Sequence, residues 1–173
     1  APMVLCLKAR KSRTLPGISL MKNLIVITGG AGFVGSNLID FLIRKTKYKI
    51  ISLDNYSSGN KSNHIINSRV KYLKGNTSDI NKLLSKYKKR IKSLFHFGEF
   101  ARIYQSFRKF DECYQTNSIG SKAVFKFCLD NKIKLIYSAT SASLGNKGSD
   151  KNLSPYAFTK SKNLELLENL KKW

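Results

Sequence analysis

The chain has 173 residues and a mass of 19.6 kDa, the size of one domain, and 42% of its residues are hydrophobic. That share can build a core and excludes wholesale disorder, and no apolar run approaches the roughly 18 residues of a transmembrane helix. The 32 Lys and Arg residues against 10 Asp and Glu give a formal charge of +22, so a polyanionic partner has to be considered.

The first twenty residues differ from those that follow. They lack acidic residues, show no clear hydrophobic period and are interrupted by Pro2, Pro16 and Gly17. They hold no apolar stretch of the roughly 7–15 residues that a signal peptide needs. Their basic composition fits a transit peptide, but a disordered extension or an upstream readthrough explains them more simply. We therefore expect residues 1–20 to be a disordered or non-native extension and Met21 to be the natural start.

From Met21 on, short apolar runs alternate with stretches of helical period. The apolar runs predict about five strands, over residues 24–27, 48–53, 69–73, 93–97 and 133–137. The periodic stretches predict a helix that begins at Phe33 and further helices over 79–90, most of 107–130 and 155–171. Apolar strands that alternate with helices indicate an α/β fold with a doubly wound parallel sheet, the Rossmann type, over residues 21–173.

The turn after the first predicted strand is rich in glycine. Gly29, Gly32 and Gly35 have the spacing G-x-x-G-x-x-G between a strand and a helix. Glycines there allow a sharp turn and a close approach of the backbone to a pyrophosphate, which free N–H groups at the helix N-terminus would bind. A glycine triplet alone also fits a flexible turn. The sequence has no G-K-[ST], which excludes a P-loop NTPase.

A carboxylate at the end of the second predicted strand strengthens the case for a dinucleotide site. Asp54 stands 19 residues after Gly35, where it can accept hydrogen bonds from both hydroxyls of an adenosine ribose. Its charge would repel a 2′-phosphate, which predicts NAD rather than NADP. The alternative is an aspartate that caps the loop before Asn55.

Tyr156 and Lys160 are the candidate catalytic pair. At positions i and i+4 they share one face of the last helix, where the ammonium can stabilise a tyrosinate. A tyrosine and a lysine four residues apart occur often by chance in a lysine-rich chain. The place of this pair in the predicted fold is therefore the stronger indication of a catalytic role. The pair follows the fifth strand at the carboxyl edge of the sheet, where ligands bind. The hydroxyls of Ser138 and Thr140 lie at the same edge, and Thr140 can orient a substrate hydroxyl.

The cysteines and histidines favour structural roles. Cys6, Cys113 and Cys128 form no C-x-x-C pair, which argues against a disulfide scaffold and a zinc site and favours a reducing, cytoplasmic compartment. We expect Cys113 and Cys128 to pack in helices, His96 to be a core or loop-facing residue of its strand, and His64 to stand alone in a polar loop.

The positive charge does not by itself indicate a nucleic-acid partner. The cations are spread along the domain, and lysine outnumbers arginine 25 to 7, whereas phosphate and base recognition favours arginine. Lys, Asn and Ile share AT-rich codons, so a biased genome explains the excess of lysine. We therefore expect no nucleic-acid partner.

Together these residues resemble the extended short-chain dehydrogenase/reductases, in particular the NAD-dependent epimerase/dehydratase group and its nucleotide-sugar epimerases of the UDP-glucose 4-epimerase type. The resemblance runs in order over residues 21–173. It rests on TGGAGFVG at 28–35, LDN at 53–55, FHF at 95–97, Asn117 with Gly120, SATSASLG at 138–145 and YAFTK at 156–160.

The resemblance implies a mechanism and a cofactor site. Tyr156 would act as acid and base on the 4-hydroxyl of a nucleotide-sugar, a UDP-sugar above all, with Thr140 as its helper and Lys160 on the nicotinamide ribose. NAD would take a hydride from sugar C4 and return it to the other face of a 4-keto sugar. The implied cofactor-binding positions are Gly29, Gly32, Phe33, Val34, Gly35, Asp54, Asn55, Phe97, Gly98, Asn117, Ser138, Tyr156 and Lys160.

The chain also departs from the family pattern. The common Ala-Ala or Ala-Gly after the fourth strand is Gly98-Glu99 here, and Asn76 replaces an aspartate. Related 4,6-dehydratases have Asp-Glu directly after the catalytic threonine, whereas Ser141-Ala142 follow here, which favours epimerisation. A reductase or decarboxylase of the same family and a non-catalytic NAD- or RNA-binding Rossmann protein stay open as alternatives.

Family members continue beyond the position of Trp173, with more strands and a smaller domain for the nucleotide-sugar. We therefore expect an N-terminal fragment, without the C-terminal substrate domain, that binds NAD weakly or in part and does not turn over alone. The resemblance also implies a homodimer through the helices over 107–130 and 155–171. We expect no metal and no membrane partner.

Overall fold

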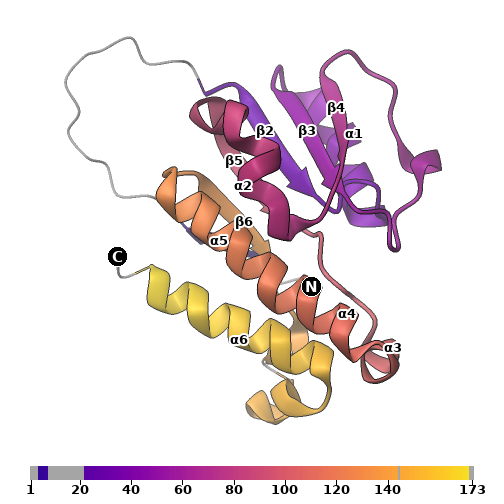
Figure 1. Cartoon of the computed structure of the whole chain (residues 1–173), viewed down its shortest axis with the longest axis vertical. Coiled ribbons are helices and arrows are strands. Elements are labelled where there is room, and N and C mark those ends of the chain that lie inside the picture. Colours follow the sequence, from indigo (N-terminus) through magenta and orange to yellow (C-terminus); the bar gives the residue numbers. More distant parts are fainter. Residues whose placement is uncertain (1–3, 8–21, 144, 172–173) are drawn as a thin grey trace.

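Figure 1 shows the fold in the computed structural model, which describes residues 4–7, 22–143 and 145–171. Six strands form one sheet in the order β1-β6-β5-β2-β3-β4. Their bounds are β1 Val4–Leu7, β2 Leu24–Thr28, β3 Lys49–Asp54, β4 Val70–Lys74, β5 Ile91–His96 and β6 Lys134–Ser138. The strands from β2 to β6 pair in parallel, which confirms the predicted doubly wound sheet of five parallel strands.

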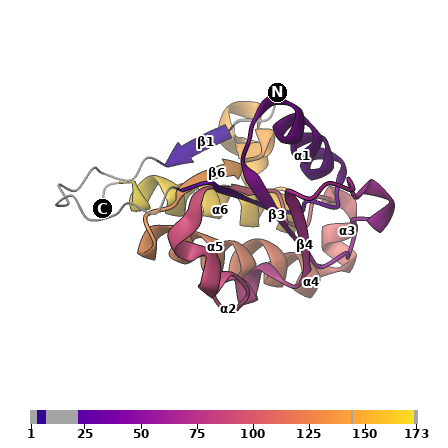
Figure 2. The same cartoon turned by 90° about the horizontal axis from the view of Figure 1, so that it is seen from above.

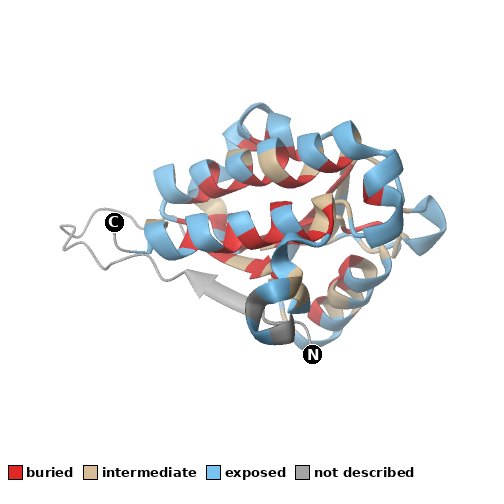
Figure 3. Cartoon of the chain, turned by 90° about the horizontal axis from the view of Figure 1, so that it is seen from below, coloured by how far each residue is buried: buried red, intermediate tan, exposed pale blue. Residues whose placement is uncertain are grey.

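Helices cover both faces of this sheet, with α1 on one face and α2 and α5 on the other (Figure 2). The helices are α1 Phe33–Lys45, α2 Ile80–Leu84, α3 Ile103–Arg108, α4 Phe110–Tyr114, α5 Ser121–Asp130 and α6 Pro155–Leu170. Each helix buries the side that faces the sheet or a neighbouring helix and exposes the other (Figure 3). This pattern explains the helical period of the apolar residues in the sequence.

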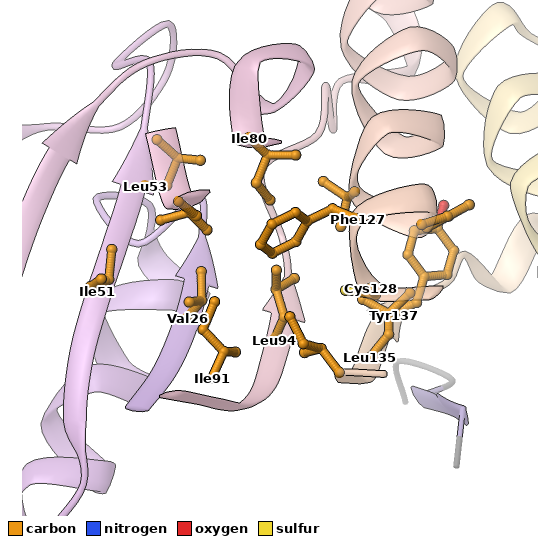
Figure 4. Close-up of a cluster of buried hydrophobic side chains, with 14 of the residues drawn as sticks. Val26, Ile51, Leu53, Ile80, Ile91, Leu94, Phe127, Cys128, Leu135 and Tyr137 are labelled. Atoms are coloured by element: carbon orange, nitrogen blue, oxygen red, sulfur yellow. The ribbon is translucent and has the colours of Figure 1, made fainter. Parts of the chain in front are cut away.

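The central strand β2 is apolar throughout because both of its faces are buried. Its alternate side chains point to opposite faces, so Ile25 and Ile27 pack on α1, whereas Leu24 and Val26 enter the larger core. Figure 4 shows that larger core, which gathers side chains from strands and from α2 and α5: Val26, Ile51, Leu53, Ile80, Ile91, Leu94, Phe127, Cys128, Leu135 and Tyr137.

Strand β1 falls in the segment for which the sequence predicted no regular structure. It pairs antiparallel with β6, with Val4 opposite Ser138 and Leu7 opposite Leu135. Four apolar residues are too few to show a period, and the partner that pairs with them, the edge of β6, lies far along the chain. Residues 1–3 and 8–20, like Leu144, lie outside the described residues, so the assignment of residues 1–20 to an extension stays a prediction.

The predicted helix over 79–90 is shorter than expected. Only α2 is α-helical, and a 3-10 helix over Ser85–Arg90 follows it. Ile80 and Leu84 are buried as expected, but beyond Leu84 the single apolar side chain of Tyr87 provides no buried stripe to hold a longer α-helix.

The predicted single helix over most of 107–130 is interrupted twice. Lys109 leaves the helical region, with φ −114° and ψ 50°, and separates α3 from α4. A π-helical segment, Gln115–Gly120, then joins α4 to α5. Such a segment holds one extra residue per turn, and here that turn carries the buried Asn117.

Candidate active site

A cavity of about 1060 Å³ runs along the carboxyl ends of the parallel strands. Its middle is formed by the glycine-rich turn between β2 and α1. One end is lined by Asp54 and the loop after β3, and the other by Gly98, Glu99, Tyr156 and Lys160. An elongated cavity at the carboxyl edge is where an open α/β sheet binds its ligand.

The glycine-rich turn is closely packed against its neighbours. Gly29 has φ +72°, a conformation that favours glycine, and a Cβ on it would lie 2.7 Å from the backbone nitrogen of Gly98. A Cβ on Gly35 would overlap the carbonyl oxygen of Gly29 and lie 2.6 Å from Cα of Gly30. Helix α1 therefore begins directly against the turn.

The N-terminus of α1 can bind an anion. Its capping residue, Gly32, supplies no side-chain hydrogen bond, and the first turn holds no acidic residue. The side chains of Phe33 and Val34 are exposed and line the cavity. The free N–H groups and the positive end of the helix dipole therefore face the cavity, and the turn and helix fit a pyrophosphate.

Asp54 is buried at the end of β3 and both caps the loop and lines the cavity. Its Oδ1 accepts a hydrogen bond from the backbone N–H of Tyr56 at 2.8 Å, and its Oδ2 accepts one from that of Ala31 at 2.9 Å. A carboxylate has about four acceptor sites, so this one retains capacity for ribose hydroxyls. The predicted role and its loop-capping alternative are compatible.

The loop after Asp54 is held by an aromatic cluster. The ring of His64 stacks on that of Tyr72 with centroids 3.7 Å apart, and its Nε2 lies 3.0 Å from the hydroxyl of Tyr56. The expectation that His64 stands alone is therefore wrong, because its partners come from β4 and from the start of the loop. Asn55 donates to the side-chain oxygen of Asn76 at 3.0 Å, and both line the cavity.

Tyr156 and Lys160 are placed by the start of α6. Ser154 caps this helix by accepting a hydrogen bond from the N–H of Ala157 at 3.0 Å, and Pro155 occupies its first turn. The helix thus begins one turn before Lys160, and the two side chains line the same end of the cavity.

Lys160 is engaged by a carboxylate that is itself buried. Its Nζ donates to Oε2 of Glu99 and to the carbonyl oxygen of Ser138, and lies 4.4 Å from the ring centroid of Tyr137. The side chains of Lys160 and Glu99 are 5% and 3% exposed. The lysine that sequence analysis assigned to the cofactor therefore forms a buried ion pair.

Three further donors converge on Oε1 of Glu99. They are the hydroxyl of Ser121 at 2.7 Å, the hydroxyl of Tyr137 at 3.0 Å and the side-chain amide of Asn163 at 3.1 Å. Burial raises the pKa of Glu99, but the Lys160 ammonium and the hydrogen bonds outweigh it and hold this pKa below its ordinary value. Burial and the Glu99 charge raise the pKa of Tyr137, whose phenol stays neutral.

His96 lies beneath this cluster and is completely buried, as expected for a core residue. Its Nδ1 lies 2.6 Å from the hydroxyl of Thr28 and its Nε2 lies 3.0 Å from that of Ser121. Burial lowers the pKa of His96 from 6.5 to about 4, an effect that Glu99 opposes and Lys160 reinforces.

We expect His96 to make the chain less stable as the pH falls from 6.5 to about 4. The unfolded histidine takes up a proton in this range and the folded one does not, so protonation favours the unfolded state by up to about 3 kcal/mol. Urea unfolding across this range measures the effect. The His96→Gln variant keeps a hydrogen-bonding amide and should show a flatter pH dependence; equal slopes in both proteins would contradict the prediction.

Twelve of the predicted site residues line the large cavity. They are Gly29, Gly32, Phe33, Val34, Gly35, Asp54, Asn55, Phe97, Gly98, Ser138, Tyr156 and Lys160. The structure thus brings the glycine turn, the acidic end of β3 and the Tyr-Lys pair together around one space.

Two predicted residues lie elsewhere. Asn117 is buried away from the cavity. Its side-chain oxygen accepts from the N–H of Phe100, and its amide nitrogen donates to the carbonyl oxygen of Phe100 and to the hydroxyl of Thr159, the latter at 3.2 Å. Thr140 lines a separate, smaller cavity of about 350 Å³, together with Ile103 and Ala157. Asn117 therefore positions the loop after β5, and Thr140 lies beside the main cavity.

From the sequence, Glu99 stood out only as a departure from the family pattern, and its contacts were not predicted. The signal was present, since an acidic side chain directly after a buried parallel strand lies at the binding edge of the sheet. The serines and the glycine at 57–59, which line the cavity near Asp54, were also missed.

Other kinds of site are not found among the described residues. No group of three or more His, Cys, Asp and Glu residues that could hold a metal ion occurs in this part of the chain. Within the same residues, no helix has the length and apolar character to cross a membrane. Cys113 and Cys128 are free and buried in helices, which confirms their expected packing role.

Comparisons with known proteins agree with this geometry. The model of the family described as NAD dependent epimerase/dehydratase matches residues 25–172. The ADP-L-glycero-D-manno-heptose-6-epimerase of Cupriavidus pinatubonensis is 26% identical over 148 residues, which are 79% of this chain and 43% of that protein.

Two solved structures share the fold. The UDP-glucose 4-epimerase of Thermotoga maritima with UDP-glucose is 27% identical, with a TM-score of 0.75 over 86% of this chain and 51% of its own. The UDP-N-acetylglucosamine 4-epimerase of Methanobrevibacter ruminantium, in complex with UDP-N-acetylmuramic acid, is 28% identical, with a TM-score of 0.74 over 88% and 51%. The chain therefore spans about half the length of these relatives.

Proposed function

Because the chain belongs to the NAD dependent epimerase/dehydratase family, we propose that it is the NAD-binding part of a nucleotide-sugar epimerase that inverts the sugar at C4. One observation carries the proposal: a single cavity joins Asp54, the glycine turn and the Tyr156–Lys160 pair in the order that a dinucleotide requires. The C4 relatives named above support the position of the reaction, while the heptose epimerase makes C6 the first alternative.

The cavity residues fit NAD. Asp54 would accept hydrogen bonds from the adenosine ribose, and the N-terminus of α1 would bind the pyrophosphate. These two placements leave the end with Lys160 and Tyr156 for the nicotinamide. When bound, NAD would supply the acceptor and donor of a hydride, which protein side chains lack.

The protein's own part in the reaction is proton transfer and positioning. Tyr156 would remove the proton of the sugar hydroxyl during oxidation and return it during reduction. Lys160 would hold the nicotinamide ribose. Thr140, in the neighbouring cavity, would orient the sugar hydroxyl, and Ser141-Ala142 after it lack the acid and base needed for dehydration.

Assembly and location are part of the same proposal. Exposed aromatic side chains on α3, α4 and α6, among them Phe107, Phe110 and Phe158, support a homodimer through the predicted helices. The free thiols of Cys113 and Cys128 are consistent with a reducing, cytoplasmic compartment.

The test is to incubate the full-length enzyme, of which this chain is the proposed NAD-binding part, with NAD and, in turn, UDP-glucose, UDP-N-acetylglucosamine and an ADP-heptose. We expect inversion at C4 of a UDP-sugar without net formation of NADH, because an epimerase returns the hydride it takes. Proton NMR of the products identifies the inverted carbon. Inversion at C6, stoichiometric consumption of the cofactor, or release of CO2 would each replace C4 epimerisation by another reaction of the family.

A further inference from the structure

A buried carboxylate lies where the proposed site would place the nicotinamide. Glu99 lines the cavity between Gly98 and Phe100, and its side chain is 3% exposed. The mechanism above has no use for it. A buried charge is costly unless it is paired, so this one requires an explanation.

We propose, on the basis of the proposed NAD site, that Glu99 is a positioning residue whose carboxylate offsets the charge of Lys160 and so favours the oxidised over the reduced cofactor. The nicotinamide ring of NAD⁺ carries one positive charge that NADH lacks. A charge beside that ring therefore changes the two affinities by different amounts, whereas a change of packing alone weakens both.

The carboxylate is fixed in place by contacts on both oxygens. Oε2 accepts from Lys160, and Oε1 accepts from donors on three different elements, Ser121, Tyr137 and Asn163. With both oxygens occupied, the group has little freedom to rotate away from the lysine. The ion pair is thus a permanent part of this end of the cavity.

Apart from Lys160, the groups that face Glu99 are neutral, so the Glu99–Lys160 ion pair is the main local charge. Lys160 on α6 is the cation, and Asn163 on α6 and Ser121 on α5 are neutral donors. Tyr137 on β6 stays neutral because burial raises its pKa, and His96 on β5 stays neutral near pH 7 because burial lowers its pKa to about 4. The cluster therefore has a net charge near zero with Glu99 and near +1 without it.

The ratio of the dissociation constants for NAD⁺ and NADH reports this charge. In the Glu99→Gln variant the unpaired ammonium of Lys160 would repel the cationic ring, and we expect the ratio to rise about tenfold. Lys160→Met removes the opposite charge and should lower the ratio. The double variant, which has neither charge, should return close to the unsubstituted chain.

Isothermal titration calorimetry of the full chain with each cofactor form measures the ratio, and circular dichroism confirms that each variant is folded. If Glu99→Gln alone does not fold, Lys160→Met and the double variant still isolate the Glu99 charge, because they differ only at position 99. A ratio that is the same in every folded variant overturns the inference and leaves the proposed function intact. A chain that binds neither NAD⁺ nor NADH contradicts the inference and the proposed function together.

Discussion

In the full-length enzyme, replacement of Tyr156 by phenylalanine should reduce turnover of a nucleotide-sugar by about 10²- to 10⁴-fold while leaving NAD binding within a few-fold of its original strength. The phenol is the group at the cavity that we assign to proton transfer, and phenylalanine retains its ring but has no proton to exchange. The side chain is only partly buried, so the fold should tolerate the change. Initial rates with the preferred UDP-sugar and calorimetric titration with NAD give the two quantities.

Tyr87→Phe is the matched control. This tyrosine lies in the 3-10 helix that precedes β5, at the amino end of the sheet and outside the cavity. Loss of the Tyr87 hydroxyl should leave turnover unchanged. Equal rates in Tyr156→Phe and the unsubstituted protein would remove Tyr156 from the mechanism. If instead NAD and sugar bind but neither the variant nor the unsubstituted protein turns over, the alternative of a non-catalytic NAD-binding protein gains support. RNA binding that weakens steeply with salt would favour the alternative of an RNA-binding protein.

Gly35→Ala should destabilise the chain by about 1–3 kcal/mol or more and abolish measurable NAD binding. The added methyl group would overlap the carbonyl oxygen of Gly29 and lie 2.6 Å from Cα of Gly30. Both atoms belong to backbone, which cannot rotate aside as a side chain could. Helix α1 would have to move away from the turn, and its N-terminus would no longer face the pyrophosphate position.

Gly32→Ala provides the comparison for stability. A Cβ on Gly32 meets only the carbonyl oxygen of Gly29, at 3.3 Å, which a small local adjustment can relieve. Urea unfolding should therefore separate the two variants, with Gly32→Ala close to the unsubstituted chain. The close packing of α1 against the turn would be disproved as a source of stability if both variants unfold at the same urea concentration.

The sheet was predictable because its central strands, β2 and β3, are buried on both faces. Runs such as Leu24–Ile27 are apolar throughout, and their order along the chain, alternating with helices, leaves few topologies. Strand β1 was not predictable, because four apolar residues gain their conformation from pairing with β6, more than a hundred residues along the chain.

The helical interruptions were not predictable for a different reason. The apolar residues of 107–130 keep a spacing close to 3.6, and a period cannot show that one turn contains an extra residue. What holds that turn is the amide of Asn117, through contacts with Phe100 and Thr159 that exist only in the folded chain.

The candidate site also has a part that the sequence predicts and a part that it does not. The glycine turn, Asp54 and the Tyr156–Lys160 pair were predictable because each is local in sequence and falls at the end of a strand or the start of a helix. The partner of Lys160 was not, since Glu99 is 61 residues away along the chain and comes beside it only when α6 packs against α3, α4 and the π-helical segment.

The π-helical turn also limits how this region can vary by insertion and deletion. Loss of one residue from Gln115–Gly120 would convert this wide turn into an ordinary α-helical turn and change which of its side chains face the loop after β5. Asn117 would then lose its contacts with the loop after β5 and with the side-chain amide of Asn163, which donates both to the Asn117 carbonyl oxygen and to Glu99. Length changes here are therefore coupled to the contacts of Glu99, and we expect natural relatives that keep Glu99 to keep the extra residue as well.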